Sequence, residues 1–182
     1  MKSPLPYLVS VLALVSGCSG PVAAAQPLPA YSRVVVVVEE NHTAQSIIGN
    51  KAAPFMNSLA SGGALMTESF AVAHPSQPNY LALFAGDTFG VSSDVCPLDL
   101  GAAPNLASEL IASGRGFGGF SEGLPAVGSP VCKAGGYARK HAPWVNFSNV
   151  PPSASVPMSA FSGDASLPTV SFVVPDLDDD MH

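Results

Sequence analysis

The sequence predicts an α/β domain whose core is a mostly parallel β-sheet with helices on both faces. Two segments, Val34–Val38 and Thr169–Val174, are rich in β-branched residues, and the first is apolar without any alternation of polar and apolar positions. Runs of this kind are typical of strands buried on both faces, as in parallel sheets covered by helices. Segments with helical spacing lie between them, and 182 residues are enough for one such core.

The first elements follow one another closely. The valine run opens the domain, and Pro54–Ala60 has apolar residues at helical spacing and ends before Gly62 and Gly63. Ala64–Val72 is expected to be a strand that leads into a polar segment. This order of strand, helix and strand is the start of a βαβ arrangement.

The alternation continues through the rest of the chain. Tyr80–Phe84 predicts a short helix, and Asn105–Ser113 predicts a longer one that begins at a capping residue. Gly116–Phe120 is expected to be a glycine-rich strand. Residues 123–165 carry many prolines and predict loops, after which the second buried strand follows.

Composition and charge exclude some classes of protein. Hydrophobic residues make up 47% and charged residues 11%, which argues against a disordered chain. The formal net charge of −6 argues against a nucleic-acid partner, because binding a polyanion needs a basic surface. A phosphorylated small molecule or a phospholipid stays compatible, since it needs only a local cluster of donors.

Residues 1–25 are expected to be an export signal. Tyr7–Val15 is an apolar run after Lys2, too short to span a bilayer, which takes about 20 residues. The sequence before Cys18 resembles a lipobox, in which that cysteine is acylated, and we favour it over cleavage after Ala23–Ala25. The protein is therefore expected to be exported, as a cell-surface lipoprotein or in secreted form, with a lipid anchor as its one membrane contact.

Residues 26–32 are expected to form a linker, and 33–182 the domain. The chain has three cysteines, an odd number for an exported protein. With Cys18 lipid-modified, Cys96 and Cys132 are left to form a disulfide that stabilises the fold by ~3–4 kcal/mol. Two buried free thiols are the alternative.

A polar segment before the Tyr80–Phe84 helix contains the leading candidate nucleophile. Ser76 is expected at the N-cap of this helix, where backbone N–H groups and the helix dipole favour an anion. Asn79 could direct its amide to the same anion. The alternative is that Ser76 and Asn79 only cap the helix.

Charged residues elsewhere suggest the remainder of a site. Glu39, Glu40 and Asn41 follow the first strand, at the sheet edge where ligands of α/β proteins bind. Asp176–His182 is a second acidic cluster that matches a calcium loop only weakly. Arg139–His141 (Arg139, Lys140 and His141) is the one concentrated positive segment and suits phosphate oxygens. Each could also be an ordinary solvated surface.

Four segments in this order resemble motifs of the bacterial phosphoesterase family, which includes acid phosphatases and phospholipases C. The segments are Val36–His42, His74–Gly86, Tyr137–Trp144 and Pro168–Pro175. The resemblance implies an alkaline-phosphatase-like fold and hydrolysis of phosphate monoesters, with a phosphoinositide as one candidate substrate. The protein is on this basis expected to be an acid phosphatase.

The resemblance also implies roles for individual residues. Ser76 is the nucleophile that becomes phosphorylated, Asn79 donates to the phosphate oxygens, and Glu40 and Asn41 hold a divalent metal cation of unknown identity. The remaining residues that it places near the site are His74, Asp180 and His182. Family members continue with a strand that carries an acidic pair, so the domain is expected to be an N-terminal portion, truncated at the C-terminus.

Two alternatives differ in class from a phosphatase. Gly119–Gly123 matches G-x-S-x-G, the nucleophile elbow of serine esterases, with Ser121 as nucleophile. The proline-rich residues that follow it cannot form the helix which that motif requires. The other alternative is a non-catalytic surface lipoprotein, or an inactive fragment, that uses the same fold for binding.

Overall fold

The structure is a computed structural model that describes residues 31–163 and 166–181. All of these residues lie within one compact unit, Tyr31–His182. The expected export signal, the lipid-modified Cys18, most of the linker and His182 therefore lie outside the described residues. No helix among the described residues has the length and hydrophobicity that a membrane crossing needs.

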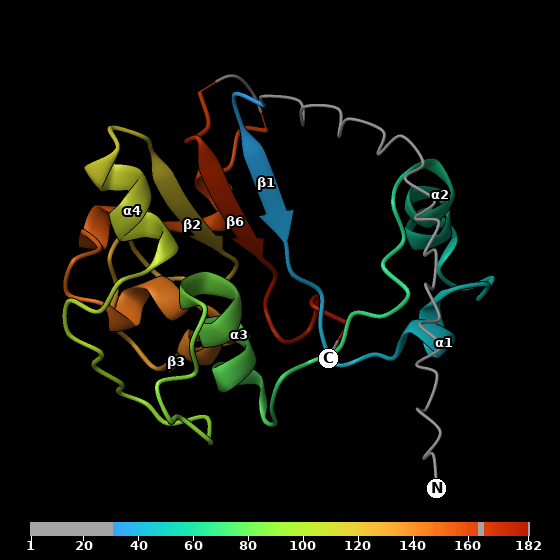
Figure 1. Ribbon diagram of the computed structural model, residues 1–182, viewed down its shortest axis with the longest axis horizontal. Coiled ribbons are helices and arrows are strands. Elements are labelled where there is room, and N and C mark those ends of the chain that lie inside the picture. The colour runs from blue at the N-terminus through green and yellow to red at the C-terminus, as the bar shows by residue number, and fades with distance from the viewer. Residues whose placement is uncertain (1–30, 164–165, 182) are drawn as a thin grey trace, which may run out of the picture. The chain divides into compact units, whose positions relative to one another are not determined.

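The centre of the fold is a four-stranded sheet in which every pairing is parallel. Across the sheet the strands are β1 (Val34–Val37), β6 (Val170–Val174), β2 (Phe117–Ser121) and β5 (Ser155–Pro157). Figure 1 shows β1, β6 and β2 side by side with their arrows pointing the same way. The expected α/β fold with a mostly parallel sheet is confirmed.

The described residues also form helices and short turns, and α3 and α4 pack against the sheet. The α-helices are α1 (Ala44–Ile47), α2 (Pro54–Gly62), α3 (Ser76–Ala85) and α4 (Leu106–Ala112). The expected loop region contains an antiparallel pair and short 3-10 helices. These are β3 (Lys133–Ala134), β4 (Tyr137–Ala138), η1 (Arg139–His141), η2 (Pro143–Asn146), η3 (Pro152–Ala154) and η4 (Met158–Ala160).

The two faces of the sheet are packed by alternate residues of the same strands. Phe172 and Val174 of β6 belong to a large core that includes residues of α3 and α4, whereas Val173 belongs to a small cluster with Phe120. Met158 and Phe161, in and after η4, pack against that second cluster. The alternation is the period-2 geometry of a strand and explains why consecutive residues of β6, Phe172, Val173 and Val174, are all apolar and buried.

Aromatic rings fill the larger core. Phe84 of α3 contacts Phe117, Trp144 and Phe172 with ring centroids 5.4 to 6.3 Å apart, in tilted or edge-on geometry. Gly119 is required here, because a Cβ atom at that position would overlap the Trp144 indole. The glycine in β2 thus allows the indole to lie directly on the sheet and to join it to α3.

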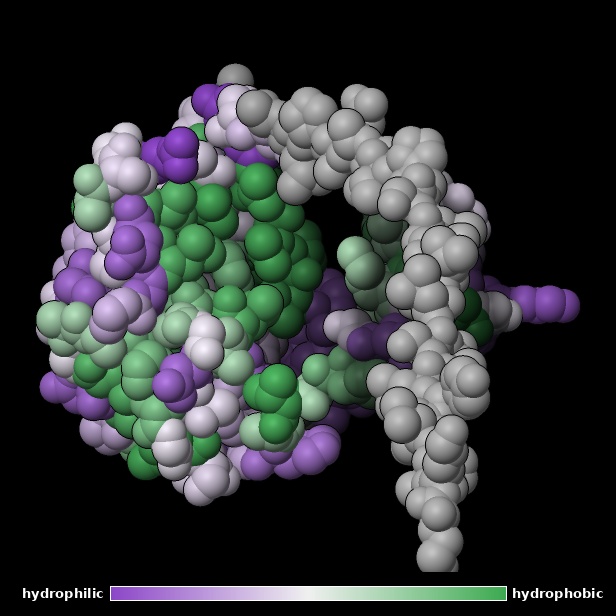
Figure 2. Space-filling model, viewed as in Figure 1, coloured by the Kyte–Doolittle hydropathy of each residue, from purple (hydrophilic) through white to green (hydrophobic). Residues whose placement is uncertain are grey.

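Two sequence expectations are wrong. β1 is an edge strand within the described residues, and Val34, Val35 and Val37 are 44%, 43% and 55% exposed instead of buried. They contribute to the hydrophobic surface of Figure 2. The β-branched run correctly predicts a strand, but burial depends on neighbours that local sequence does not specify. Ala64–Val72 contains no strand: it is an exposed loop.

Candidate active site

The candidate site lies where β1 and β6 end and α3 begins. Glu40 follows β1, and its backbone N–H donates to the carbonyl of Asp180, which follows β6 (2.9 Å). Parallel neighbouring strands end at the same sheet edge, so their polar extensions meet there. Ser76, the first residue of α3, faces the same place.

α3 begins earlier than the sequence predicts, at Ser76 and not at Tyr80. Pro75 takes the N-cap position without a side-chain hydrogen bond, so Ser76 is the first helical residue and not the expected N-cap. Pro78 is tolerated because a first-turn residue needs no N–H partner inside the helix. The Ser76 hydroxyl is therefore free to bond outside the helix.

Ser76 and Glu40 are in direct contact. The Ser76 hydroxyl donates to the Glu40 carboxylate, with its Oγ 2.8 Å from Oε2 and 3.1 Å from Oε1. Both side chains line a cleft of about 810 Å³. The cleft also contains Asn41, His74, Asn79 and Lys140, so the structure brings together most of the residues selected from the sequence.

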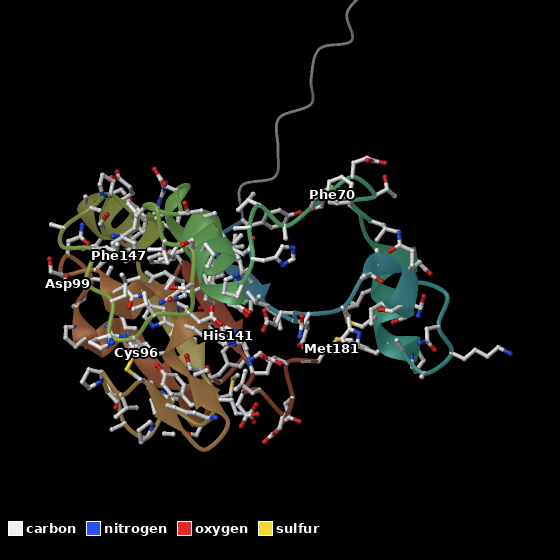
Figure 3. All side chains as sticks on the ribbon, turned by 90° about the horizontal axis from the view of Figure 1, so that it is seen from below. Phe70, Cys96, Asp99, His141, Phe147 and Met181 are labelled. Carbon is white, nitrogen blue, oxygen red and sulfur yellow. A yellow bond between two sulfur atoms is a disulfide. The ribbon has the colours of Figure 1, made fainter. Side chains whose placement is uncertain are left out.

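His141 lies behind Glu40, between two carboxylates. Its Nε2 is 3.0 Å from Glu40 Oε1 and its Nδ1 is 3.3 Å from Asp180 Oδ2. The imidazole stacks on the Tyr80 ring with centroids 4.6 Å apart and an interplanar angle of 12°. Figure 3 labels His141 and Met181. His141 contacts Asp180, the residue that precedes Met181 in the segment after β6. The structure thus places His141 next to the expected metal ligand.

Burial and negative charge dominate this region. Burial, and then the charges of Glu40, Asp180 and Glu39, raise the pKa of Tyr80 above its ordinary value, so its phenol stays neutral. Burial, followed by the charges of Asp180 and Asp179, also raises the pKa of Glu39. A site with this much negative charge favours a cation.

The donor set fits a divalent metal ion. Glu40, His141 and Asp180 each offer a ligand atom, and these atoms lie within 4.8 Å of one another. Carboxylate and imidazole ligands suit zinc, manganese and iron. Asn41, the other expected ligand, lines the cleft beside Glu40. Asp180 is fully buried, which a nearby cation would offset.

A second group of carboxylates follows β2 and β6. Glu122, Asp176 and Asp179 offer oxygens within 4.8 Å of one another, and the Asp176 N–H donates to Glu122 Oε2 at 3.1 Å. The acidic segment after β6 is therefore divided: Asp180 faces the candidate site, and Asp176 and Asp179 face Glu122. No motif in the sequence connects Glu122 with this segment.

Two expected phosphate-binding side chains are engaged elsewhere. The Asn79 amide donates to the carbonyls of Ala73 and Pro75, and its oxygen accepts from the Val72 and Ala73 N–H groups, so it shapes the loop before α3. Arg139 is buried and does not line the cleft. It lines a separate pocket of about 390 Å³ instead. The expected substrate contact of Arg139 is replaced by a structural role.

Lys140 does line the cleft, and it forms an ion pair that the sequence did not predict. Its Nζ is 3.0 Å from Asp94 Oδ2, and Asp94 lines the same cleft. No motif marks Asp94, which lies in a loop remote from both Ser76 and Lys140 in the sequence. Only the tertiary fold brings them together.

The predicted esterase nucleophile and the predicted disulfide both lie outside the cleft. Ser121 is the last residue of β2 and is 2% exposed, outside the cleft, and no helix follows it. It lacks the exposed turn of a nucleophile elbow. Cys96 and Cys132 form the expected disulfide, with Cα atoms 5.9 Å apart.

The sequence is similar to a family of known proteins. The model of the Phosphoesterase family matches residues 49–182. A phosphatidylinositol-3-phosphatase of Mycobacterium tuberculosis is 62% identical over 162 residues, which cover 87% of this chain and 54% of that protein. A phosphate-repressible acid phosphatase of Penicillium chrysogenum is 33% identical over 140 residues, covering 70% and 34%.

An acid phosphatase of Aspergillus fumigatus is 31% identical over 142 residues, covering 70% of this chain and 32% of its own length. The chain thus spans about half or less of the length of these relatives. No solved structure matches.

Proposed function

The chain belongs to the phosphoesterase family, and on that premise we propose that the protein hydrolyses phosphate monoesters in the Ser76 cleft. The observation that carries the proposal is the contact between Ser76 and Glu40 at the first turn of α3. A hydroxyl held against a carboxylate, at the start of a helix whose dipole favours an anion, has the arrangement of an activated nucleophile.

The reaction proceeds in two displacements. Ser76 Oγ attacks phosphorus, its proton passes to the Glu40 carboxylate to which it is hydrogen-bonded, and the ester P–O bond breaks. Glu40 then gives that proton to the leaving alkoxide, which departs as the alcohol. Water then attacks the phosphoserine, which releases inorganic phosphate and restores the hydroxyl. His141 and Asp180 hold Glu40 in place through this cycle.

A divalent cation fits beside this pair. Glu40, His141 and Asp180, with Asn41 nearby, are the residues that would hold it. Such a cation supplies positive charge next to the serine oxygen and the phosphate, where negative charge accumulates.

Metal removal is expected to stop turnover. Treatment with EDTA should lower the release of p-nitrophenol from p-nitrophenyl phosphate at least ~100-fold, because the charge on the phosphate is no longer neutralised. Added Mn²⁺, Zn²⁺ or Mg²⁺ should restore it, and the metal that restores it best is identified in the same assay. Full activity in EDTA-treated, metal-free protein would contradict the metal proposal but not the role of Ser76.

The natural substrate that we propose is a phosphoinositide. Its support is the identity to a protein named phosphatidylinositol-3-phosphatase. Release of inorganic phosphate from soluble dibutanoyl phosphatidylinositol 3-phosphate should exceed that from inositol 3-phosphate. Equal rates on the two would show that the lipid part is not recognised.

We also propose that the protein is exported and that Cys18 carries lipid, on the evidence of the N-terminal sequence. In the expressing bacterium, a Cys18→Ser variant should move from the membrane fraction to the medium. Mass spectrometry of the mature N-terminus checks this directly. An unmodified N-terminus beyond Ala25 in the wild-type protein would support the secreted form instead.

A further inference from the structure

Asp94 connects the helix that carries Ser76 to the Lys140 ammonium, which lines the cleft. Its Oδ1 accepts a hydrogen bond from the Gln77 N–H at 2.9 Å, and its Oδ2 lies 3.0 Å from Lys140 Nζ. Gln77 follows Ser76 in the first turn of α3, where N–H groups have no partner within the helix. One carboxylate thus holds the start of α3 and the Lys140 ammonium together.

Lys140 is the one lysine or arginine among the described residues that line the cleft. The substrate carries a phosphate of charge near −2, and Glu40 already gives the cleft a negative charge. A fixed ammonium in the cleft that contains Ser76 therefore favours phosphate binding. A lysine side chain is long and flexible, so fixing it requires a partner.

The disulfide holds the two loops that carry this pair. Asp94 lies two residues before Cys96, and Lys140 follows the β3–β4 hairpin that begins after Cys132. The bond between the two cysteines joins these segments across 36 residues of sequence. Asp94 and Lys140 are thus held near each other by a covalent link as well as by their ion pair.

Arg139 ties the same loops a second time. Its guanidinium donates to the carbonyl of Leu98, from the Asp94 loop, at 3.0 Å, and to the carbonyl of Pro130, from the Lys140 segment, also at 3.0 Å. Arg139 is 8% exposed, and its neighbour in sequence is Lys140. A buried arginine and a disulfide therefore both join the two loops that carry this partly exposed ion pair.

Stability does not account for this arrangement. The Lys140 and Asp94 side chains are 22% and 27% exposed, and ion pairs in contact with solvent contribute little to folding. The ion pair instead determines the position of the Lys140 ammonium. We propose that Asp94 is a positioning residue for phosphate-ester hydrolysis: it fixes the Lys140 ammonium on the cleft wall, where the ammonium binds the substrate phosphate. This rests on the proposed function.

The variant Asp94→Asn separates positioning from helix anchoring. The asparagine oxygen still accepts the Gln77 N–H, whereas the charge that holds Lys140 is lost. We expect KM for p-nitrophenyl phosphate to rise about tenfold, with kcat within about twofold, because an interaction made in both the bound substrate and the transition state is removed. The inhibition constant of inorganic phosphate should rise by the same factor.

Lys140 variants complete a double-mutant cycle. Lys140→Ala should raise KM at least as much as Asp94→Asn, and Lys140→Arg should retain most of the wild-type KM. The double variant should be no worse than Lys140→Ala alone, because Asp94 acts only through Lys140. If the two effects instead multiply, Asp94 acts independently and the proposal is wrong.

Asp87→Asn is the matched control. Asp87 lies in the same connection after α3, accepts a backbone N–H from Phe89 at 2.7 Å and does not line the cleft. The Asp87→Asn variant should leave KM for p-nitrophenyl phosphate unchanged. The proposal is overturned if Asp94→Asn behaves like Asp87→Asn, lowers KM, or loses kcat together with melting temperature.

Calorimetric titration with inorganic phosphate keeps the two proposals distinguishable. Weaker phosphate binding by Asp94→Asn than by the wild-type protein would support the positioning role of Asp94. This holds even if the protein hydrolyses no ester, a finding that would contradict the proposed function but not the positioning role. If Asp94→Asn and the wild-type protein bind phosphate equally, and turnover depends on Ser76, the positioning role of Asp94 is wrong and the proposed function stands.

Discussion

Replacing Ser76 with alanine is expected to reduce phosphate release at least ~10³-fold, the largest effect of any single substitution in this chain. The hydroxyl is hydrogen-bonded to Glu40, and its loss removes the oxygen that forms the proposed covalent intermediate. Steady-state assays with p-nitrophenyl phosphate measure the loss. Binding of inorganic phosphate should persist, because the alanine removes the nucleophile and leaves Lys140 in place.

A covalent intermediate provides a second measurement for Ser76. Rapid acid quench of the wild-type protein during turnover should give a peptide that contains Ser76 with one added phosphate, and Ser76→Ala should give none. Ser69→Ala is the control, since Ser69 lines the same cleft but has no contact with Glu40. Normal turnover by Ser76→Ala, or a phosphate on another residue, would refute the assignment.

The sequence predicts the central elements of the site because each depends on local pattern. The valine run places Glu40 at the end of a strand, and the polar segment before Tyr80 places Ser76 at the start of a helix. A parallel sheet then brings strand ends and helix starts to one edge. The contact between Ser76 and Glu40 follows from these three facts, although no single stretch of sequence contains it.

Other features depend on partners that the sequence does not identify. Arg139 and Lys140 are adjacent, yet one is buried among carbonyl oxygens and the other lines the cleft. η1, a 3-10 helix, directs neighbouring side chains in different directions, and only the packed loops decide which of them is enclosed. Asp94 was missed for the same reason: its two partners come from distant segments.

The valines of β1 give a complementary example. Their pattern reports strand propensity, which is a property of the residues, and was interpreted as burial, which is a property of the assembled sheet. The same reasoning succeeds for β6, because that strand lies between β1 and β2 and has packed residues on both faces. Position in the sheet, and not composition, separates these two strands.

Replacing His141 with alanine is expected to lower both stability and activity. The imidazole lies between Glu40 and Asp180, and deleting a buried hydrogen-bonding group costs about 1–3 kcal/mol. The stacking on Tyr80 is lost as well. Thermal unfolding should therefore show a clearly lower melting temperature, and kcat should fall ~100-fold because Glu40 is no longer held against Ser76.

The choice of replacement separates packing from charge. His141→Gln retains a polar group that can donate to one carboxylate, so it should recover part of the stability but little of the activity, which depends on both contacts. His42→Ala is the control, since His42 lines the cleft but is exposed and contacts only Ser46 in the described structure. If His141→Ala kept wild-type kcat at a temperature where it is folded, the imidazole would stabilise the fold without orienting Glu40. The catalytic geometry would then depend on Ser76, Glu40 and the cation alone.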